Sequence, residues 1–288
     1  MWLLFAFLSA VFAAVGRTCI KSAAEVAGDP AVVFARFALA APLAWLLLAI
    51  MGIPTIGPDF WYSVLVACLF DLPAIIFMTK SLRSSSIAMS VPLLSFSPAF
   101  LLGIGFFMLG ETPTAVGIAG VMTIVLGAYL LRLPGRGGSW LAPFILLSTD
   151  KGARYMLATA VLFAFAGVYF KRAIVSSSPF FSLAISLSVN ATAYALLHTL
   201  RRKSVRELLP NRTSVKRLIT LGVAVFLVAL CANIAFSTGL TSYVVAIKRL
   251  SILFNIILGA IVFKEPGLRR NLSSAGIMVV GAALVVLG

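Results

Sequence analysis

The chain has 288 residues, of which 61% are hydrophobic and 11% are charged, and its mean hydropathy is +1.11. A soluble domain has about a quarter of its residues charged, so this composition excludes a water-soluble globular protein. The formal net charge of +15 would suggest nucleic-acid binding in a soluble protein. Here the basic residues lie mostly between apolar runs, as they do beside anionic lipid headgroups, and we expect no nucleic-acid partner.

Apolar runs long enough to cross a bilayer, which takes about 20 residues, recur along the whole chain. The first run has no basic segment before it, so we expect it to stay as a span rather than to be cleaved as a signal. Backbone amides in hydrocarbon must be paired within their own segment, so each run is predicted to be helical. The sequence therefore predicts an all-α integral membrane protein with ten transmembrane helices, at residues 1–20, 30–51, 60–79, 87–109, 114–132, 153–171, 178–199, 217–238, 241–263 and 272–288.

The two halves of the chain resemble each other. The fourth run ends in Leu-Gly-Glu-Thr-Pro at Glu111 and the ninth in Phe-Lys-Glu-Pro at Glu265, and a glycine-containing run follows each. Five helices per half is an odd number, so the halves must insert in opposite orientations, and inverted repeats are the usual architecture of secondary transporters. We expect one repeat over 1–132, a linker over 133–152 and a second repeat over 153–288, arranged around a central cavity.

The loops differ sharply in charge. Loops after the odd-numbered runs carry 17 Lys and Arg, whereas the other loops and both termini carry only Lys171 and Arg172. The positive-inside rule then places the odd-numbered loops in the cytoplasm and both termini outside. We expect a multi-pass protein of the cell inner membrane.

Taken in order, these features resemble the drug/metabolite transporter superfamily, specifically its EamA-type ten-helix members. The resemblance covers essentially the whole chain and rests on the two repeats, the helix ends at Glu111 and Glu265, and Arg36 in the second run, where the family places an arginine. It implies a central cavity between the repeats and transport of amino acids, sugars, nucleotide precursors or drugs, often with proton exchange. Cytoplasmic termini are usual among the characterised relatives, so the charge distribution here departs from the family.

The Lys248-Arg249 pair in the ninth run is the strongest candidate for substrate binding. A charge near the bilayer centre costs roughly 2.5–3.5 kcal/mol, so such a residue suggests a function. Lys248, Ser251 and Asn255 are spaced to share one helical face, and cations beside hydroxyl and amide donors suit an anionic group. The short segment also resembles the Lys-Arg pair of plastid sugar-phosphate/phosphate translocators, which implies phosphate binding. Alternatively, the pair is structural and bonds Asp71 and helix carbonyls.

Asp71 is the acidic residue that lies deep inside a predicted span, the third. An intramembrane carboxylate near a cation is typical of proton-coupling sites. The alternative is a fixed salt bridge to Lys248, Arg249 or Arg36, and both interpretations remain open.

Two polar stripes also occur within apolar runs. Ser182, Ser186 and Asn190 recur every four residues in the seventh run, and Asn233 lies in the eighth. We expect Ser186, Asn190 and Asn233 to line the cavity, with hydrogen bonding between helices as the alternative. Glu111 and Glu265 follow helix ends and are expected to cap and pack rather than to contact substrate.

The remaining features of the sequence argue against an enzyme. The three cysteines are far apart, and the sequence indicates no metal site, cofactor or nucleophile–base pair, so we expect no enzyme. The sequence predicts an alternating-access transporter, monomeric or homodimeric, of a small polar metabolite, most of all an organic or phosphorylated anion. Membrane lipids are its other expected partners, and proton coupling is left open. The alternatives are a proton-coupled exporter of amino acids or other neutral or zwitterionic metabolites and, from another class, a non-transporting membrane subunit or an intramembrane enzyme.

Overall fold

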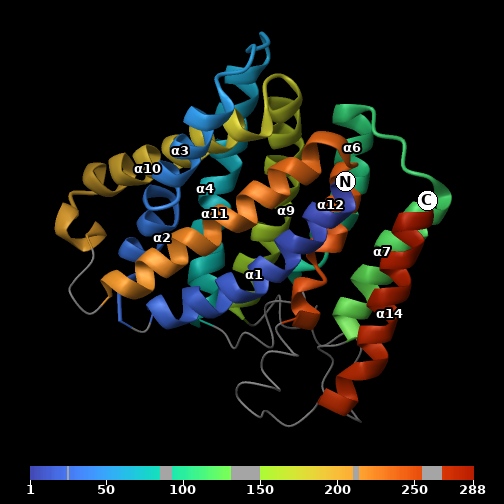
Figure 1. Ribbon diagram of the computed structural model, residues 1–288. Coiled ribbons are helices and arrows are strands. Elements are labelled where there is room, and N and C mark those ends of the chain that lie inside the picture. The colour runs from blue at the N-terminus through green and yellow to red at the C-terminus, as the bar shows by residue number, and fades with distance from the viewer. Residues whose placement is uncertain (25, 85–92, 131–149, 210–213, 255–267) are drawn as a thin grey trace. The chain divides into compact units, whose positions relative to one another are not determined.

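The computed structural model describes residues 1–24, 26–84, 93–130, 150–209, 214–254 and 268–288, and these contain helices and no β-strand (Figure 1). This confirms the predicted all-helical class, and a helix lies within every one of the ten apolar runs. The helices are α1 (Trp2–Ala24), α2 (Asp29–Ala38), α3 (Ala41–Met51), α4 (Phe60–Ser84), α6 (Ser97–Leu109), α7 (Ala115–Leu130), α9 (Lys151–Val175), α10 (Pro179–Leu200), the 3-10 helix η1 (Val205–Leu208), α11 (Val215–Thr238), α12 (Thr241–Lys248) and α14 (Leu268–Leu287).

Many of these helices are suited to a membrane by length and composition. Within the described residues, five segments are long and apolar enough to cross a bilayer: Asp29–Met51, Phe60–Ser81, Lys151–Val175, Pro179–Leu200 and Val215–Thr238. Shorter apolar helices, of 10–17 residues, add Trp2–Arg17, Ser97–Leu109, Ala115–Leu130 and Ser274–Leu287.

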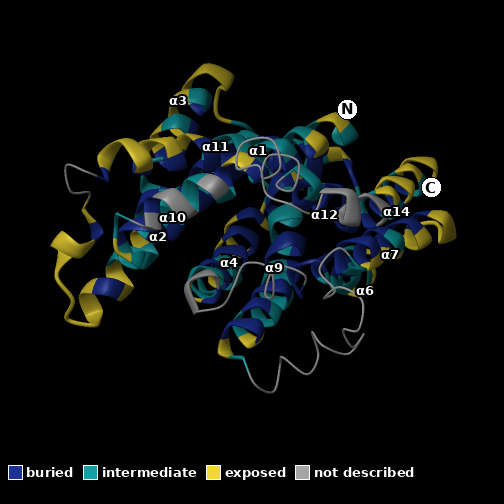
Figure 2. Cartoon of the chain, turned by 90° about the horizontal axis from the view of Figure 1, so that it is seen from below, coloured by how far each residue is buried: buried dark blue, intermediate teal, exposed yellow. Residues whose placement is uncertain are grey.

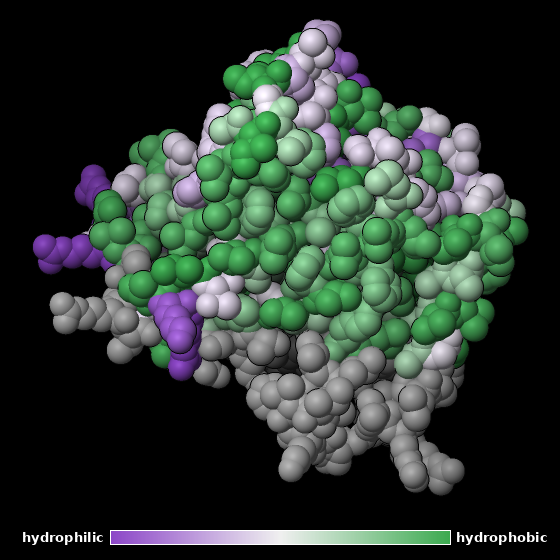
Figure 3. All heavy atoms as spheres, viewed as in Figure 1, coloured by the Kyte–Doolittle hydropathy of each residue, from purple (hydrophilic) through white to green (hydrophobic). Residues whose placement is uncertain are grey.

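Large apolar side chains cover the outer faces of the helices. Leu46 on α3, Leu69 on α4 and Phe107 on α6 are 63%, 69% and 83% exposed. Most described atoms on the face shown in Figure 3 are hydrophobic, and in Figure 2 the exposed residues follow one side of helices such as α3 and α14. Such faces belong in hydrocarbon rather than in water.

The chain forms two compact units. The first comprises Met1–Leu72 and Tyr169–Thr238, and the second Pro73–Val168 and Gly239–Gly288. Both units contain helices from both predicted repeats, so compact packing and sequence repetition divide the chain differently. The repeat boundaries, the opposite orientation of the halves and the central cavity stay predictions.

In the first unit, α1 packs along α11, and α10 packs against α2, α3 and α11. The Ser9 hydroxyl on α1 donates to the Val228 carbonyl on α11 at 3.0 Å. In the second unit, α7 packs along α14, and α6 packs against α7 and α12. Gly120 lets α7 and α14 approach closely, because a Cβ there would lie 2.6 Å from the Val285 amide nitrogen.

Three apolar runs contain a break instead of one continuous helix. The second is interrupted at Leu39-Ala40, the fourth at Ser95-Phe96 and the ninth at Arg249-Leu250. Pro42 lies in the first turn of α3 and Pro98 in the first turn of α6, and a proline cannot donate to the preceding turn. At the ninth-run break the bonds tighten to three-residue spacing, with Leu250 N donating to the Ile247 carbonyl at 3.0 Å.

Candidate functional site

The first unit contains a polar cluster at the centre of three helices. Asp71 on α4 is half-buried, and its Oδ2 accepts a hydrogen bond from Asn190 Nδ2 on α10 at 2.9 Å. The Asp71 carboxylate also interacts electrostatically with the guanidinium of Arg36 on α2. Asp71, Asn190 and Arg36, all named from the sequence, thus belong to one region of the first unit, and a salt bridge between Asp71 and Arg36 stays a prediction.

The other residues of the polar stripe on α10 are also buried within the first unit. Ser182, Ser186 and Asn190 are all buried. The Ser186 carbonyl accepts from the thiol of Cys68 on α4 at 3.7 Å, and its hydroxyl donates to the Leu183 carbonyl at 3.1 Å. The Ser182 hydroxyl and Asn190 Oδ1 are buried with no hydrogen-bond partner in the described part of the chain. Such groups are unfavourable in hydrocarbon unless a ligand or water reaches them.

Asn233 lies apart from this cluster. It is buried on α11, and its Nδ2 donates at 3.4 Å to the carbonyl of Pro179, which begins α10. Asn190 follows eleven residues later, about 16 Å along a helix. The Asn233 contact is of the interhelical kind that was the alternative to cavity lining.

The Lys248-Arg249 pair belongs to the second unit, at the end of α12. Lys248 is half-buried, Arg249 is 8% exposed, and the Arg249 guanidinium donates to the hydroxyl of Ser97, which begins α6. Ser251 is fully buried, and Asn255 lies outside the described residues. Because Asp71 belongs to the first unit, its pairing with Lys248 or Arg249 stays a prediction.

The breaks in the fourth and ninth runs occupy equivalent positions. The same number of residues separates Glu111 from Glu265 and Ser95 from Arg249, so the break residues Ser95-Phe96 correspond to Arg249-Leu250. The Arg249–Ser97 bond therefore joins the second break to the helix that starts at the first. Interrupted helices at corresponding positions of two repeats are a recurrent setting of substrate sites in transporters.

Glu111 follows the C-terminal end of α6 and binds the N-terminal end of α12. Its carboxylate accepts from the Thr241 amide at 2.8 and 3.0 Å and from the Thr241 hydroxyl at 2.6 Å, which caps the first turn of α12. Gly105 makes room for it, because a Cβ there would lie 3.1 Å from Glu111 Oε2. The expected capping role is observed, although Glu111 caps a helix of the other half rather than its own; Glu265 lies outside the described residues.

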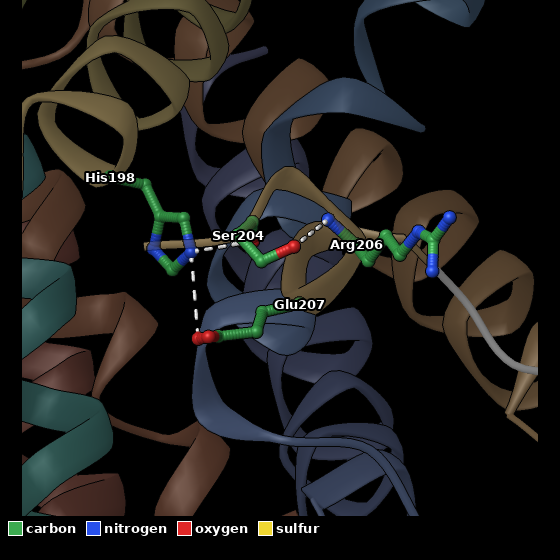
Figure 4. A network of polar contacts seen from close by, with 4 residues as sticks. All are labelled: His198, Ser204, Arg206 and Glu207. Atoms are coloured by element: carbon green, nitrogen blue, oxygen red, sulfur yellow. Dashed lines mark hydrogen bonds and ion pairs between the residues drawn. The ribbon is translucent and has the colours of Figure 1, made fainter. Parts of the chain in front are cut away.

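A further polar network closes the end of α10 (Figure 4). His198 is buried, and its Nε2 donates to the Ser204 carbonyl at 3.2 Å and lies 3.5 Å from Glu207 Oε2. The Ser204 hydroxyl accepts from the Arg206 amide at 3.3 Å and caps η1. The helix η1, which contains Glu207, packs against α2 and α10.

The sequence did not point to Ser95, Ser97 or His198. Pro98 was the available signal for the first two, because a proline within an apolar run marks a helix break. His198 gave none, since its partners are a backbone carbonyl and Glu207 of the short helix η1. Among the described residues no cluster of His, Cys, Asp and Glu could hold a metal ion.

One protein family matches nearly the whole chain. The EamA-like transporter family matches twice, over residues 1–133 and 150–287. A structure titled "Crystal structure of protein" is similar with a TM-score of 0.79 and 16% sequence identity, over 99% of this chain and 98% of that one, which shows a shared fold. No curated protein gives a significant match. With two family matches that span nearly all of its length, the chain belongs to the EamA-like transporter family, and it is a membrane transporter of small molecules.

Proposed function

We propose that this transporter carries a small organic anion, carboxylated or phosphorylated, by alternating access across the cell inner membrane. The observation that carries the proposal is Arg249, an arginine 8% exposed at a helix break inside an apolar run. A buried cation in a membrane is stabilised only by an anionic or strongly dipolar partner. An anionic substrate supplies such a partner in one state of the transport cycle and removes it in the next.

The groups around Arg249 support this choice. Its guanidinium already donates to Ser97, and the planar guanidinium group has further donors for a carboxylate or phosphate. Ser95 is fully buried, and its hydroxyl has no hydrogen-bond partner among the described residues. Both serines stand at the start of α6, where helix amide groups favour negative charge. Lys248, which precedes Arg249, adds a second, half-buried cation.

Two acidic residues of this unit that the structure describes, Glu111 and Asp150, have other partners. Glu111 is held by Thr241 at the opposite end of α12, about 12 Å along an eight-residue helix. Asp150 accepts from the Gly152 amide in the first turn of α9. These two carboxylates are engaged with backbone and hydroxyl groups, and an anionic substrate would add a further ligand to the Lys248-Arg249 pair.

Transport of a neutral or zwitterionic metabolite in exchange for protons is the second candidate, and Asp71 favours it. A half-buried carboxylate with an amide donor and an arginine beside it can hold or release a proton according to its surroundings. If Asp71 carries the coupling proton, Asp71→Asn should leave substrate binding intact but make uptake independent of a pH gradient.

The test is flux into proteoliposomes that contain the purified chain alone, with a panel of radiolabelled carboxylates, sugar phosphates and amino acids. Arg249→Gln and Lys248→Gln should each weaken anion uptake roughly ten- to a hundredfold, the effect of one charge-assisted hydrogen bond. Lys216→Gln, which removes an exposed cation from α11, is the matched control. Uptake of amino acids alone, unchanged in Arg249→Gln, would reject the anion proposal, and no flux of any compound would favour a non-transporting subunit.

A further inference from the structure

A basic patch lies at one end of the second unit, away from the residues of the proposed transport site. It consists of Lys80 near the end of α4 and Lys151 and Arg154 at the start of α9, and all three side chains are exposed. The Lys80 ammonium lies 5.7 Å from the centre of the Tyr155 ring, next to Arg154. Lys151, Arg154 and Tyr155 share one helical face by their spacing.

The two helix ends that carry the patch are fastened together. The Ser81 hydroxyl, fully buried, donates to the Gly152 carbonyl at 2.7 Å. Phe77 on α4 stacks on Tyr155 with ring centres 5.5 Å apart. The ends of α4 and α9 that carry the three cations are therefore held side by side (Figure 2).

The patch has a net positive charge beside a helix N-terminus. Lys151 and Arg154 occupy the first turn of a 25-residue helix, where the helix dipole disfavours cations. Asp150 accepts a bond from the Gly152 amide at 2.8 Å and offsets part of this positive charge. One acidic side chain against three cations leaves the surface positive.

We propose that the patch formed by Lys80, Lys151 and Arg154 binds the phosphate of an anionic phospholipid headgroup. The helices that end here are long and apolar enough to cross a bilayer, so their ends meet the headgroup layer, where the phosphates are. The aromatic pair Phe77–Tyr155 adds an apolar surface beside the cations, which suits the glycerol and the first acyl carbons. This surface does not depend on the proposed transport of an anion.

The test is native mass spectrometry of the full chain, purified in detergent and incubated with equal amounts of phosphatidylglycerol and phosphatidylcholine. The wild type should retain phosphatidylglycerol preferentially. Lys80→Gln, Lys151→Gln and Arg154→Gln combined should weaken that retention roughly tenfold or more. The control combines Arg201→Gln, Lys203→Gln and Lys216→Gln, which removes three exposed cations of the segment from Arg201 to Arg217 and should weaken the retention less than the patch variant does.

Two results would overturn the proposal. The first is equal loss of phosphatidylglycerol in both triple variants, which would indicate a general charge effect. The second is equal stabilisation of the wild type by inorganic phosphate and by phosphatidylglycerol in a thermal-shift assay, which would indicate a free-anion site. The double variant Lys151→Gln with Arg154→Gln, which leaves the Lys80–Tyr155 contact in place, serves if the triple variant does not fold; unchanged retention in it would also reject the lipid site.

Discussion

The Asp71 and Arg36 side chains place opposite charges near each other inside the first unit, with Asn190 donating to the carboxylate. In a low-dielectric setting, the loss of one member of such a pair is costlier than the loss of both, because the remaining charge keeps its desolvation penalty. A structural bond and a proton-coupling site are the two alternatives for this pair, and stability and transport measurements separate them.

We expect Asp71→Asn and Arg36→Gln each to lower the thermal unfolding midpoint in detergent, and the double variant to be less destabilised than the sum of the two. The coupling should amount to about 0.5–3 kcal/mol. Exposed Asp59 and Lys216 provide a control pair, Asp59→Asn with Lys216→Gln, for which the effects should add. Strictly additive effects at Asp71 and Arg36 as well would show that the two side chains do not interact.

Glu111 is the residue whose role is best defined by its contacts. Glu111→Ala leaves the Thr241 amide without its carboxylate partner, so we expect a loss of about 1–3 kcal/mol of stability. Glu111→Gln keeps one acceptor oxygen and should lie between alanine and the wild type. Thermal unfolding of the three proteins measures the order, and an alanine variant as stable as the wild type would contradict the capping role.

At the scale of helices, the α7–α14 contact depends on the absence of side chains. A Cβ at Gly120 would lie 2.6 Å from Val285 N and 2.8 Å from Gly281 O, both backbone atoms that cannot move aside. Gly120→Ala should therefore cost about 1–3 kcal/mol by forcing the helices apart. Gly103→Ala is the matched control, since nothing lies within 4 Å of its Cβ and alanine favours a helix. Equal unfolding midpoints for the two variants would show that the helices can separate freely.

The sequence predicted which segments form helices because an apolar run in hydrocarbon has no other way to pair its amides. The breaks before α3 and α6 could also have been predicted from the sequence, since Pro42 and Pro98 mark them. The break at Arg249-Leu250 was not, because the described residues around it include no proline. Partners far apart in sequence, such as Asn190 with Asp71, follow from helix packing, which periodicity alone does not specify.

For the whole molecule, the distribution of basic residues predicts how the chain crosses the membrane. The segment from Arg201 to Arg217 carries seven Lys and Arg, and η1 within it folds against α2 and α10. Each Lys or Arg near an anionic cytoplasmic leaflet is worth about 1 kcal/mol, so moving this segment to the outer side would be strongly unfavourable. Cytoplasmic exposure of this segment, together with an even number of spans, predicts that both termini lie outside.

Arg206→Cys tests this orientation, because Arg206 is exposed within the segment. Cys68 and Cys231 are buried and Cys19 is partly exposed, so Cys19→Ala serves as the background. A membrane-impermeant maleimide should label the new cysteine in inside-out vesicles and not in intact cells, whereas a permeant maleimide should label it in both. Labelling of intact cells by the impermeant reagent would reverse the predicted orientation and bring this chain into line with relatives whose termini are cytoplasmic. It would leave the helices and the Arg249 site unchanged, since neither depends on which side of the membrane the loops face.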